Sequence, residues 1–339
     1  MASPNPPQPA RLLVGVLLVP LIVIAALSAF AWSAARLEPR HLPLGVAGSE
    51  QTVTALTARL EHQANAIDVH MYKNETEATQ AIKDRDVYGA IVTTPEGVTV
   101  LTASAASPIV AQELTSVAAQ ATGDNAGAAK EPPHIVDVVP ASPKDPRGVA
   151  LSSSVLPLVL AGVLTGLIVT GVSRPGAARL GALITAAAMA GLAGAAITQS
   201  WLGVIGGNWV ANAAVLGLTV LAIASLVAGL DAVWGRIGQV VAAMLMVFIG
   251  NPFSGVSSAP ELLPQPVGRL GQLLPPGAGG NLLRSTAFFD GNGAAVHLTV
   301  LLVWVGLGLT PLIWTGLRSR QESRPTKPET AMSPNSANA

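Results

Sequence analysis

The sequence predicts a membrane α-helical protein with about six transmembrane helices, arranged as one plus five, and a small α/β extracytoplasmic domain inserted after the first helix. Several apolar stretches approach the ~20 residues that a helix needs to cross the hydrocarbon core of a bilayer. Only 11% of the 339 residues are charged, against about 25% in soluble domains. Residues 36–148 differ, because their composition is that of a small soluble domain.

The first apolar stretch, residues 12–35, follows a proline-rich N-terminus of residues 1–11 that is expected to be cytoplasmic. Two interpretations stay open. The stretch is a retained transmembrane helix, or it is a secretory signal peptide cleaved near Ala29-Phe30-Ala31 or Ser33-Ala34-Ala35. Its length exceeds the usual ~7–15 apolar residues of a signal peptide, which favours the retained helix.

The extracytoplasmic segment, residues 36–148, contains short alternating runs that predict strands and periodic runs that predict helices. The expected strands are residues 42–48, 67–72, 88–93, 98–103 and 135–139. Helices are expected from about Glu50, after Asn74, and over residues 109–121, with a linker over residues 122–146. Asn74 precedes Glu77 by three residues, which is typical of a capping box. The order fits one sheet covered by helices.

The charged side chains between Lys73 and Asp86, Arg85 among them, are expected to form a mixed, solvated face of this domain.

The second membrane block, residues 149–317, is expected to hold five further helices. They are predicted at residues 153–172, 180–198, 211–230, 237–250 and 296–317. The stretch 237–250 is short and needs its neighbours to complete a crossing. Glycines at 162 and 166, and small residues over 186–196, predict close helix packing. Residues 318–339 are expected to form a disordered cytoplasmic tail.

Orientation follows from the cytoplasmic bias of arginine and lysine in short loops. With the N-terminus inside, most basic side chains near the helix ends become cytoplasmic, among them Arg11, Arg174, Arg179, Arg236 and Arg318. Both termini are then cytoplasmic. Residues 36–148 and a proline-rich outer loop of residues 251–295 are extracytoplasmic. Arg269 and Arg284 fall on the outer side, against the rule.

Composition excludes several functions. Cysteine is absent, so disulfides and thiolate nucleophiles are excluded. The five histidines are scattered without metal-ligand spacing. The formal net charge is zero, so no nucleic-acid partner is expected. No acid/base pair or P-loop is present, so we expect no cofactor, no metal and no enzymatic activity. No charge falls mid-span, which argues against ion-coupled transport.

The proline-rich outer loop carries a motif. Pro260 and Pro264 flank Glu261-Leu262-Leu263, Pro275 follows Leu273-Leu274, and Leu283-Arg284 precedes the last helix. This pattern, with the one-plus-five layout, resembles the ABC-2 type exporter permeases, particularly the YhgE/Pip (phage infection protein) group of Gram-positive bacteria. The stretch from Tyr88 to Val92 also resembles part of that group's ectodomain.

The resemblance implies a multi-pass protein of the bacterial cell membrane, the permease subunit of an exporter. It would work with a separate ABC ATPase and with a second permease, which is either another copy of the same chain, as a homodimer, or a different one. Together they would move an amphipathic or lipid-linked substrate outward. The candidate ATPase-docking residues at the cytoplasmic loops are Arg174, Arg179, Asp231, Trp234 and Arg236. Alternatively, these charges only set the topology.

A second function stays open beside the exporter. The loop at residues 173–179 is very short, whereas ABC-2 permeases usually present a cytoplasmic coupling helix. The alternative is a non-transport envelope scaffold or receptor, whose ectodomain binds a wall component or a partner protein.

Overall fold

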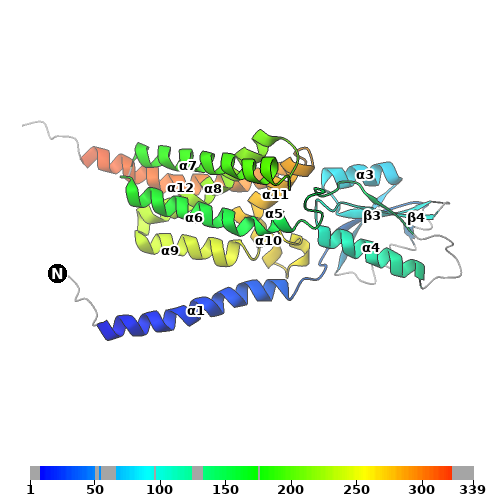
Figure 1. Cartoon of the computed structure of the whole chain (residues 1–339), viewed down its shortest axis with the longest axis horizontal. Helices are drawn as coiled ribbons and strands as arrows, with labels where there is room; N and C mark the ends of the chain where they lie inside the picture. Colours follow the sequence, from blue (N-terminus) through cyan, green and yellow to red (C-terminus); the bar gives the residue numbers. More distant parts are fainter. Residues whose placement is uncertain are drawn as a thin grey trace, which may run out of the picture.

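The computed structural model describes residues 8–49, 53–54, 66–94, 97–123, 133–174 and 176–322. An α/β domain lies at one end of the molecule and a block of long helices extends from it (Figure 1). The first helix, α1 (Gln8–Ala34), begins at the end of the block away from that domain, and the last helix, α12 (Ala294–Glu322), ends there. The mixed α/β domain and the apolar helices therefore occupy opposite ends of the molecule.

The α/β domain is built on one mixed five-stranded sheet. The strands are β1 (Leu42–Ala47), β2 (Ile67–Tyr72), β3 (Gly89–Thr94), β4 (Gly97–Thr102) and β5 (His134–Asp137). Their order is β2-β1-β3-β4-β5, and only the β3–β4 pair is antiparallel. Each strand lies within two residues of the segment that alternation predicts. Only two residues separate β3 from β4 in the sequence, which is too few for a parallel crossover, so this pair is antiparallel.

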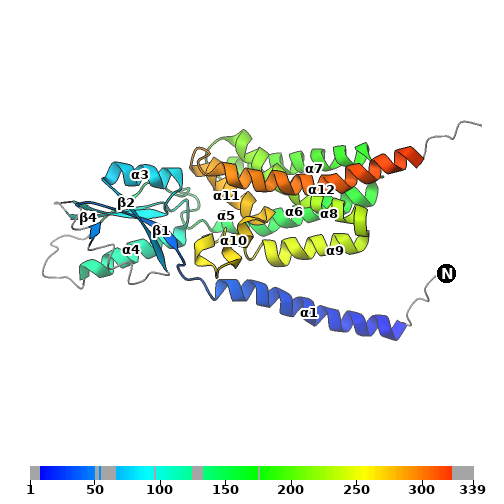
Figure 2. The same cartoon turned by 180° about the vertical axis from the view of Figure 1, so that it is seen from behind.

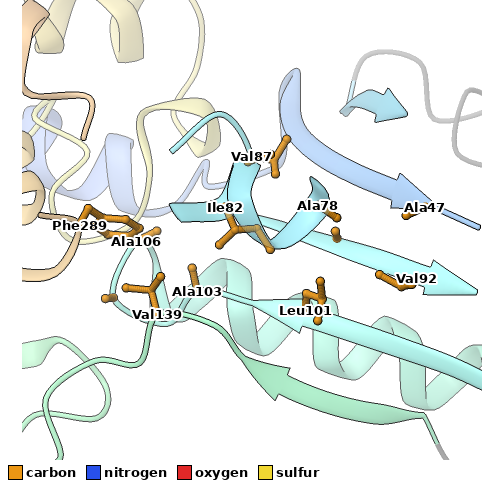
Figure 3. Close-up of a cluster of buried hydrophobic side chains, with 13 residues drawn as sticks. Ala47, Ala78, Ile82, Val87, Val92, Leu101, Ala103, Ala106, Val139 and Phe289 are labelled. Atoms are coloured by element: carbon orange, nitrogen blue, oxygen red, sulfur yellow. The ribbon is translucent and has the colours of Figure 1, made fainter. Parts of the chain in front are cut away.

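Two helices, α3 (Glu75–Asp84) and α4 (Pro108–Gly123), cover opposite faces of the sheet (Figures 1 and 2). The predicted cap of α3 is confirmed, because the Asn74 side chain accepts a hydrogen bond from the Glu77 backbone N–H at 2.9 Å. Figure 3 shows the apolar cluster beneath α3, where Ala78 and Ile82 pack on side chains of β3 and β4. The helix expected near Glu50 falls largely outside the described residues, of which only Val53 and Thr54 are helical.

The helical block follows. Its first helices are α5 (Val149–Ser153), α6 (Val155–Val172), α7 (Ala177–Ala195) with the π-helical η1 (Ala196–Trp201), α8 (Trp209–Trp234), and α9 (Arg236–Met244) with the π-helical η2 (Leu245–Gly250). The short segments η3 (Pro260–Leu262), α10 (Val267–Gln272) and α11 (Pro275–Phe288) precede α12. Helix α8 is central and contacts α6, α7, α9, α11 and α12.

Burial follows this arrangement. A helix that is apolar all round is buried on all sides, and 78% of the most apolar window of α8 is buried inside the block. The corresponding figure for α1 is 6%, and α1 runs apart from the other helices in both views (Figures 1 and 2). Except at the end of α1 that is nearest the α/β domain, the apolar side chains of this helix are therefore expected to face lipid.

The predicted close packing at small residues is present. A Cβ atom added to Gly162 would lie 2.7 Å from Ile223 Cβ, and one added to Gly166 would lie 2.6 Å from Val227 Cβ. Gly191 lies directly against the backbone of α8 at Gly217. Glycine at these positions lets α6 and α7 approach α8 closely.

Among the residues that the structure describes, five helical segments are long and apolar enough to cross a membrane. They are Val16–Ala34, Val149–Val172, Ala177–Trp201, Trp209–Trp234 and Ala294–Arg318, while Arg236–Gly250 is a shorter apolar helix. Among the described residues, α12 continues to Glu322, so a tail beginning at residue 318 is wrong in its boundary. Arginine and glutamine are good helix formers, so the charges that end the apolar run do not end the helix. Residues 323–339 lie outside the described residues.

Candidate functional site

The α/β domain contacts the outer segment, which we define as residues 251–293, containing η3, α10 and α11. The prolines of the predicted motif shape this segment. Pro260 begins η3, Pro264 follows it, and Pro275 is the first residue of α11, where proline costs no hydrogen bond. Helix α11 is almost wholly buried and contacts α8 and α12. It is therefore part of the block's interior.

Apolar contacts attach the domain to the outer segment. Phe289 at the end of α11 lies in the cluster beneath α3, close to Ala106 (Figure 3). On the opposite face of the sheet, Leu262 of η3 packs in the same cluster as Leu44 of β1 and Leu114 of α4. The outer segment therefore completes both hydrophobic cores of the domain.

Backbone hydrogen bonds add a second attachment. The Glu38 N–H donates to Leu262 O at 3.0 Å, and the Arg40 N–H donates to Glu261 O at 2.9 Å. The Arg40 guanidinium also donates to Leu262 O at 2.8 Å. The link between α1 and β1 is thereby tied to η3.

Arg85 forms the third attachment. Its guanidinium donates to Asn281 O at 3.0 Å, to Asn281 Oδ1 at 3.0 Å and to Ser285 Oγ at 2.5 Å, all on α11. It also lies 5.2 Å from the centre of the Phe289 ring. The expectation of a solvated face is wrong for Arg85. The residue caps α3 in the left-handed conformation, φ 68°, at the end of the helix nearest α11.

A partly buried polar pair lies beside Arg85. The Tyr88 hydroxyl donates to Glu261 Oε2 at 2.7 Å. Burial, followed by the negative charge of Glu261, raises the pKa of Tyr88 well above 10.0, although Arg85 and Arg284 act in the opposite direction. The phenol is therefore neutral and the carboxylate is its acceptor.

Of the last two motif residues, Leu283 packs in the apolar interior of the block, and Arg284 is the most deeply buried cation of the outer segment, 3% exposed. The Arg284 guanidinium donates to Val256 O at 2.5 Å, and its Nε has no hydrogen-bond partner. Burial, then the charge of Arg85, lowers the pKa of Arg284 to about 10, so the side chain stays charged at neutral pH.

A cavity of about 540 Å³ lies where the domain meets the outer segment and the start of α12. Its charged and polar lining residues are Arg40, His41, Asp68, Arg85, Tyr88, Glu261, Gln265, Arg269, Gln272, Asn281 and His297. Three of these are arginines and two are carboxylates. Arg269 is exposed. We call this recess the outer cavity.

A second polar cluster lies at the opposite end of the block. Arg179 in the first turn of α7 forms an ion pair with Asp231 near the end of α8, with Nη1 and Oδ2 3.3 Å apart. Arg179 also donates to the backbone oxygens of Ser173 at 2.8 Å and Thr170 at 3.2 Å. Gln239 of α9 donates to Asp231 Oδ1 at 2.9 Å. These bonds join four helices.

The candidate docking residues differ in their exposure. Arg179 is buried and Asp231 is partly buried, because they pair with each other, so neither is the exposed side chain that the sequence suggested. Arg174, Trp234 and Arg236 are exposed at the same end and stand outside the cluster. Opposite charges at the ends of two predicted helices are the signal from which the pair could have been inferred.

The Tyr88 pair gives a spectroscopic prediction. The chain has two tyrosines, so a Tyr72→Phe variant leaves Tyr88 as the only phenol. The pKa of Tyr88 is higher in the folded chain than in the unfolded chain. Its neutral phenol therefore contributes folding stability below pH 10, and this contribution is lost as the pH rises through the folded-state pKa. Tyr88 is therefore expected to ionise only well above pH 10, together with unfolding, as followed by phenolate absorbance.

The matched control for this titration is Tyr88→Phe, which leaves the partly exposed Tyr72. Its pKa is also raised, by burial and by Asp86, but Tyr72 is expected to titrate below Tyr88. Ionisation of Tyr88 near pH 10 in the folded chain would contradict the partly buried pair.

The helical block, with its long apolar helices, defines the chain as a multi-pass membrane protein. A family model described as ABC-2 family transporter protein matches residues 10–143. That segment covers α1 and the strands and helices of the α/β domain. The match is a similarity to that family over less than half of the chain. No curated protein and no solved structure matches the chain.

Proposed function

We propose that the chain is the permease subunit of an ABC-2 type exporter in a bacterial cell membrane, and that it moves an amphipathic or lipid-linked substrate outward with a separate ATPase. The observation that carries the proposal is the match over residues 10–143, on a chain whose remainder is a block of apolar helices. The ABC-2 permease family generally works with an ATPase subunit. The chain itself has no enzymatic activity in this proposal.

The proposal includes a topology of six crossings with both termini cytoplasmic, in which Arg236–Gly250 is the short fifth crossing. The exposed Arg174, Arg236 and Arg318 support it, because they follow α6, begin α9 and lie near the end of α12. These helix ends lie away from the α/β domain (Figure 1), as the cytoplasmic bias of arginine requires. Residues 36–148 are then extracytoplasmic. Within the family we place the chain in the YhgE/Pip-like group, on the prolines that shape the outer segment.

The ATPase is proposed to dock at the inner end of the block. Arg174 follows α6, and Trp234 and Arg236 flank the turn at Gly235, so all three side chains are free to meet a partner. Arg179 and Asp231 hold the helices that present them. A second permease, either another copy of the chain or a related one, completes the exporter.

Co-purification from native membranes tests this proposal. The full chain is expected to recover an ATP-binding cassette subunit. A double variant, Arg174→Ala with Arg236→Ala, is expected to recover about tenfold less, equivalent to ~1.4 kcal/mol of binding free energy. The control is Arg147→Ala, an exposed arginine on the outer side. Consistent failure to recover any ATPase with the unaltered chain contradicts the proposal.

One observation favours the alternative of an envelope scaffold or receptor. The links at the inner end are short, since Gly235 alone separates α8 from α9 and residues 173–176 separate α6 from α7. No helix lies in these links to receive an ATPase, among the residues that the structure describes. A deletion strain with unchanged efflux but altered phage adsorption or wall-protein recruitment would establish this function instead.

A further inference from the structure

The outer cavity has an excess of positive charge in its wall. Behind the wall, Arg284 is buried, and its one hydrogen bond goes to a neutral carbonyl. Arg85 likewise bonds only to neutral oxygens of Asn281 and Ser285. In the described part of the chain, no carboxylate oxygen lies within 4.0 Å of either guanidinium. A buried cation without a counter-ion is unfavourable, so an anion at this place would be stabilising.

The nearest carboxylates offset this excess only in part. Glu261 accepts the hydrogen bond of the Tyr88 hydroxyl and keeps its negative charge, which acts to raise the pKa of Arg85 against the larger effect of burial. Asp68 lies at the cavity rim, is mostly exposed, and pairs with His70 at 3.6 Å. Facing them are Arg40, Arg85 and Arg269, and of these only Arg40 has a carboxylate partner, Glu38 at 3.3 Å.

The cavity is also lined by polar side chains that have no partner among the described residues. Arg269 lines the cavity, is exposed, and has no hydrogen bond or ion pair among the described residues. His297 lines it from the first turn of α12, and its Nδ1 is buried without a partner. Guanidinium and imidazole donors that converge on a recess are the groups that bind phosphate and carboxylate oxygens.

Apolar surface adjoins the charged wall. Val296, also in the first turn of α12, lines the cavity and is 69% exposed. Val303 and Leu307 continue this exposed apolar surface on the same face of α12. A molecule with an anionic head and an apolar tail can therefore place its head in the cavity and its tail against α12.

We infer that the outer cavity binds a phosphate-type anion, held by Arg269, Arg85 and His297, and that this anion is the head group of an amphipathic molecule or a free anion of the same chemistry. The inference rests on the proposed function for the side of the membrane that the cavity faces, and it names the substrate class of the exporter as anionic. Binding itself requires neither the ATPase nor transport.

The test compares three forms of the full-length chain in detergent: unaltered, Arg269→Gln, and the matched control Arg147→Gln. Neither arginine makes a hydrogen bond or ion pair among the described residues, and both are exposed on the outer side, so all three forms are expected to fold alike. Lipid retention is measured by native mass spectrometry with phosphatidylglycerol and, separately, with phosphatidylcholine. Inorganic phosphate is titrated by calorimetry.

Phosphatidylglycerol is expected to be retained in preference to phosphatidylcholine. Arg269→Gln is expected to reduce that preference about fivefold, the equivalent of ~1 kcal/mol for a partly exposed charge contact. Arg147→Gln is expected to leave it unchanged, and Asp68→Asn to increase it. Binding of phosphate alone, sensitive to Arg269→Gln, supports a free anion as the ligand.

The inference is overturned if the unaltered chain neither retains phosphatidylglycerol in preference to phosphatidylcholine nor binds inorganic phosphate. It is also overturned if Arg269→Gln and Arg147→Gln change anion binding by the same amount. Recovery of the ATPase alongside that result leaves the proposed function standing. If the chain binds the anion but recovers no ATPase, the anion site is supported and the exporter proposal is contradicted.

Discussion

Arg179→Ala is expected to lower the free energy of unfolding by about 3 kcal/mol, because removing one partner of a buried ion pair leaves the other charge uncompensated. Asp231 would keep only its bond from Gln239, and the carbonyl oxygens of Thr170 and Ser173 would lose their donors. The measurement is thermal or denaturant unfolding of the purified chain in a fixed detergent.

Arg236→Ala is the matched control, since it removes an exposed arginine from the same end of the block. Its effect is expected to stay within about 0.5 kcal/mol. A double variant, Arg179→Leu with Asp231→Leu, is expected to recover much of the loss, because it removes both charges together. Equal unfolding curves for Arg179→Ala and Arg236→Ala would show that the ion pair does not join these helices.

Gly308→Leu is expected to lower the free energy of unfolding by at least as much as Arg179→Ala does, by about 3 kcal/mol or more. Gly308 of α12 lies against the backbone of Ser225 and Leu226 of α8, and Gly229 lies against Gly308 itself. Any side chain at position 308 must push α12 away from the central helix. Reduced stability and increased proteolysis of the full chain in detergent would report this separation.

Gly306 provides a close control, because it lies on the same helix and a Cβ added there meets no atom within 4 Å. Gly306→Leu is expected to be neutral or slightly stabilising, since leucine has the higher helix propensity by up to ~1 kcal/mol. Similar losses for the two variants would mean that glycine matters here through the backbone and not through the contact between α12 and α8.

Periodicity and apolar length, which are local properties, predicted much of the fold. The strands of the sheet lie within two residues of the predicted segments, because alternation marks a half-buried strand directly. The apolar helices were likewise found from length alone. The end of α12 was missed because charge ends an apolar run without ending a helix.

The polar contacts were less accessible from the sequence. Arg85 and Asn281 are 196 residues apart, and Arg179 and Asp231 are 52 residues apart. Nothing near Arg85 distinguishes it from its solvated neighbours, since its contacts depend on where α11 lies. The prolines of residues 251–295 marked a motif in the outer loop, but they did not indicate that this loop would complete the cores of a domain encoded near the other end of the chain.

The dependence of the α/β domain on the outer segment has a consequence during synthesis. Residues 36–148 leave the ribosome about 114 residues before Leu262 and about 141 residues before Phe289, which fill the two cores. At ~5–20 residues per second, this delay is roughly 6–30 s. For that time the nascent domain exposes Leu44 on one face and Ala106 on the other, and it is open to chaperones, proteases and premature association.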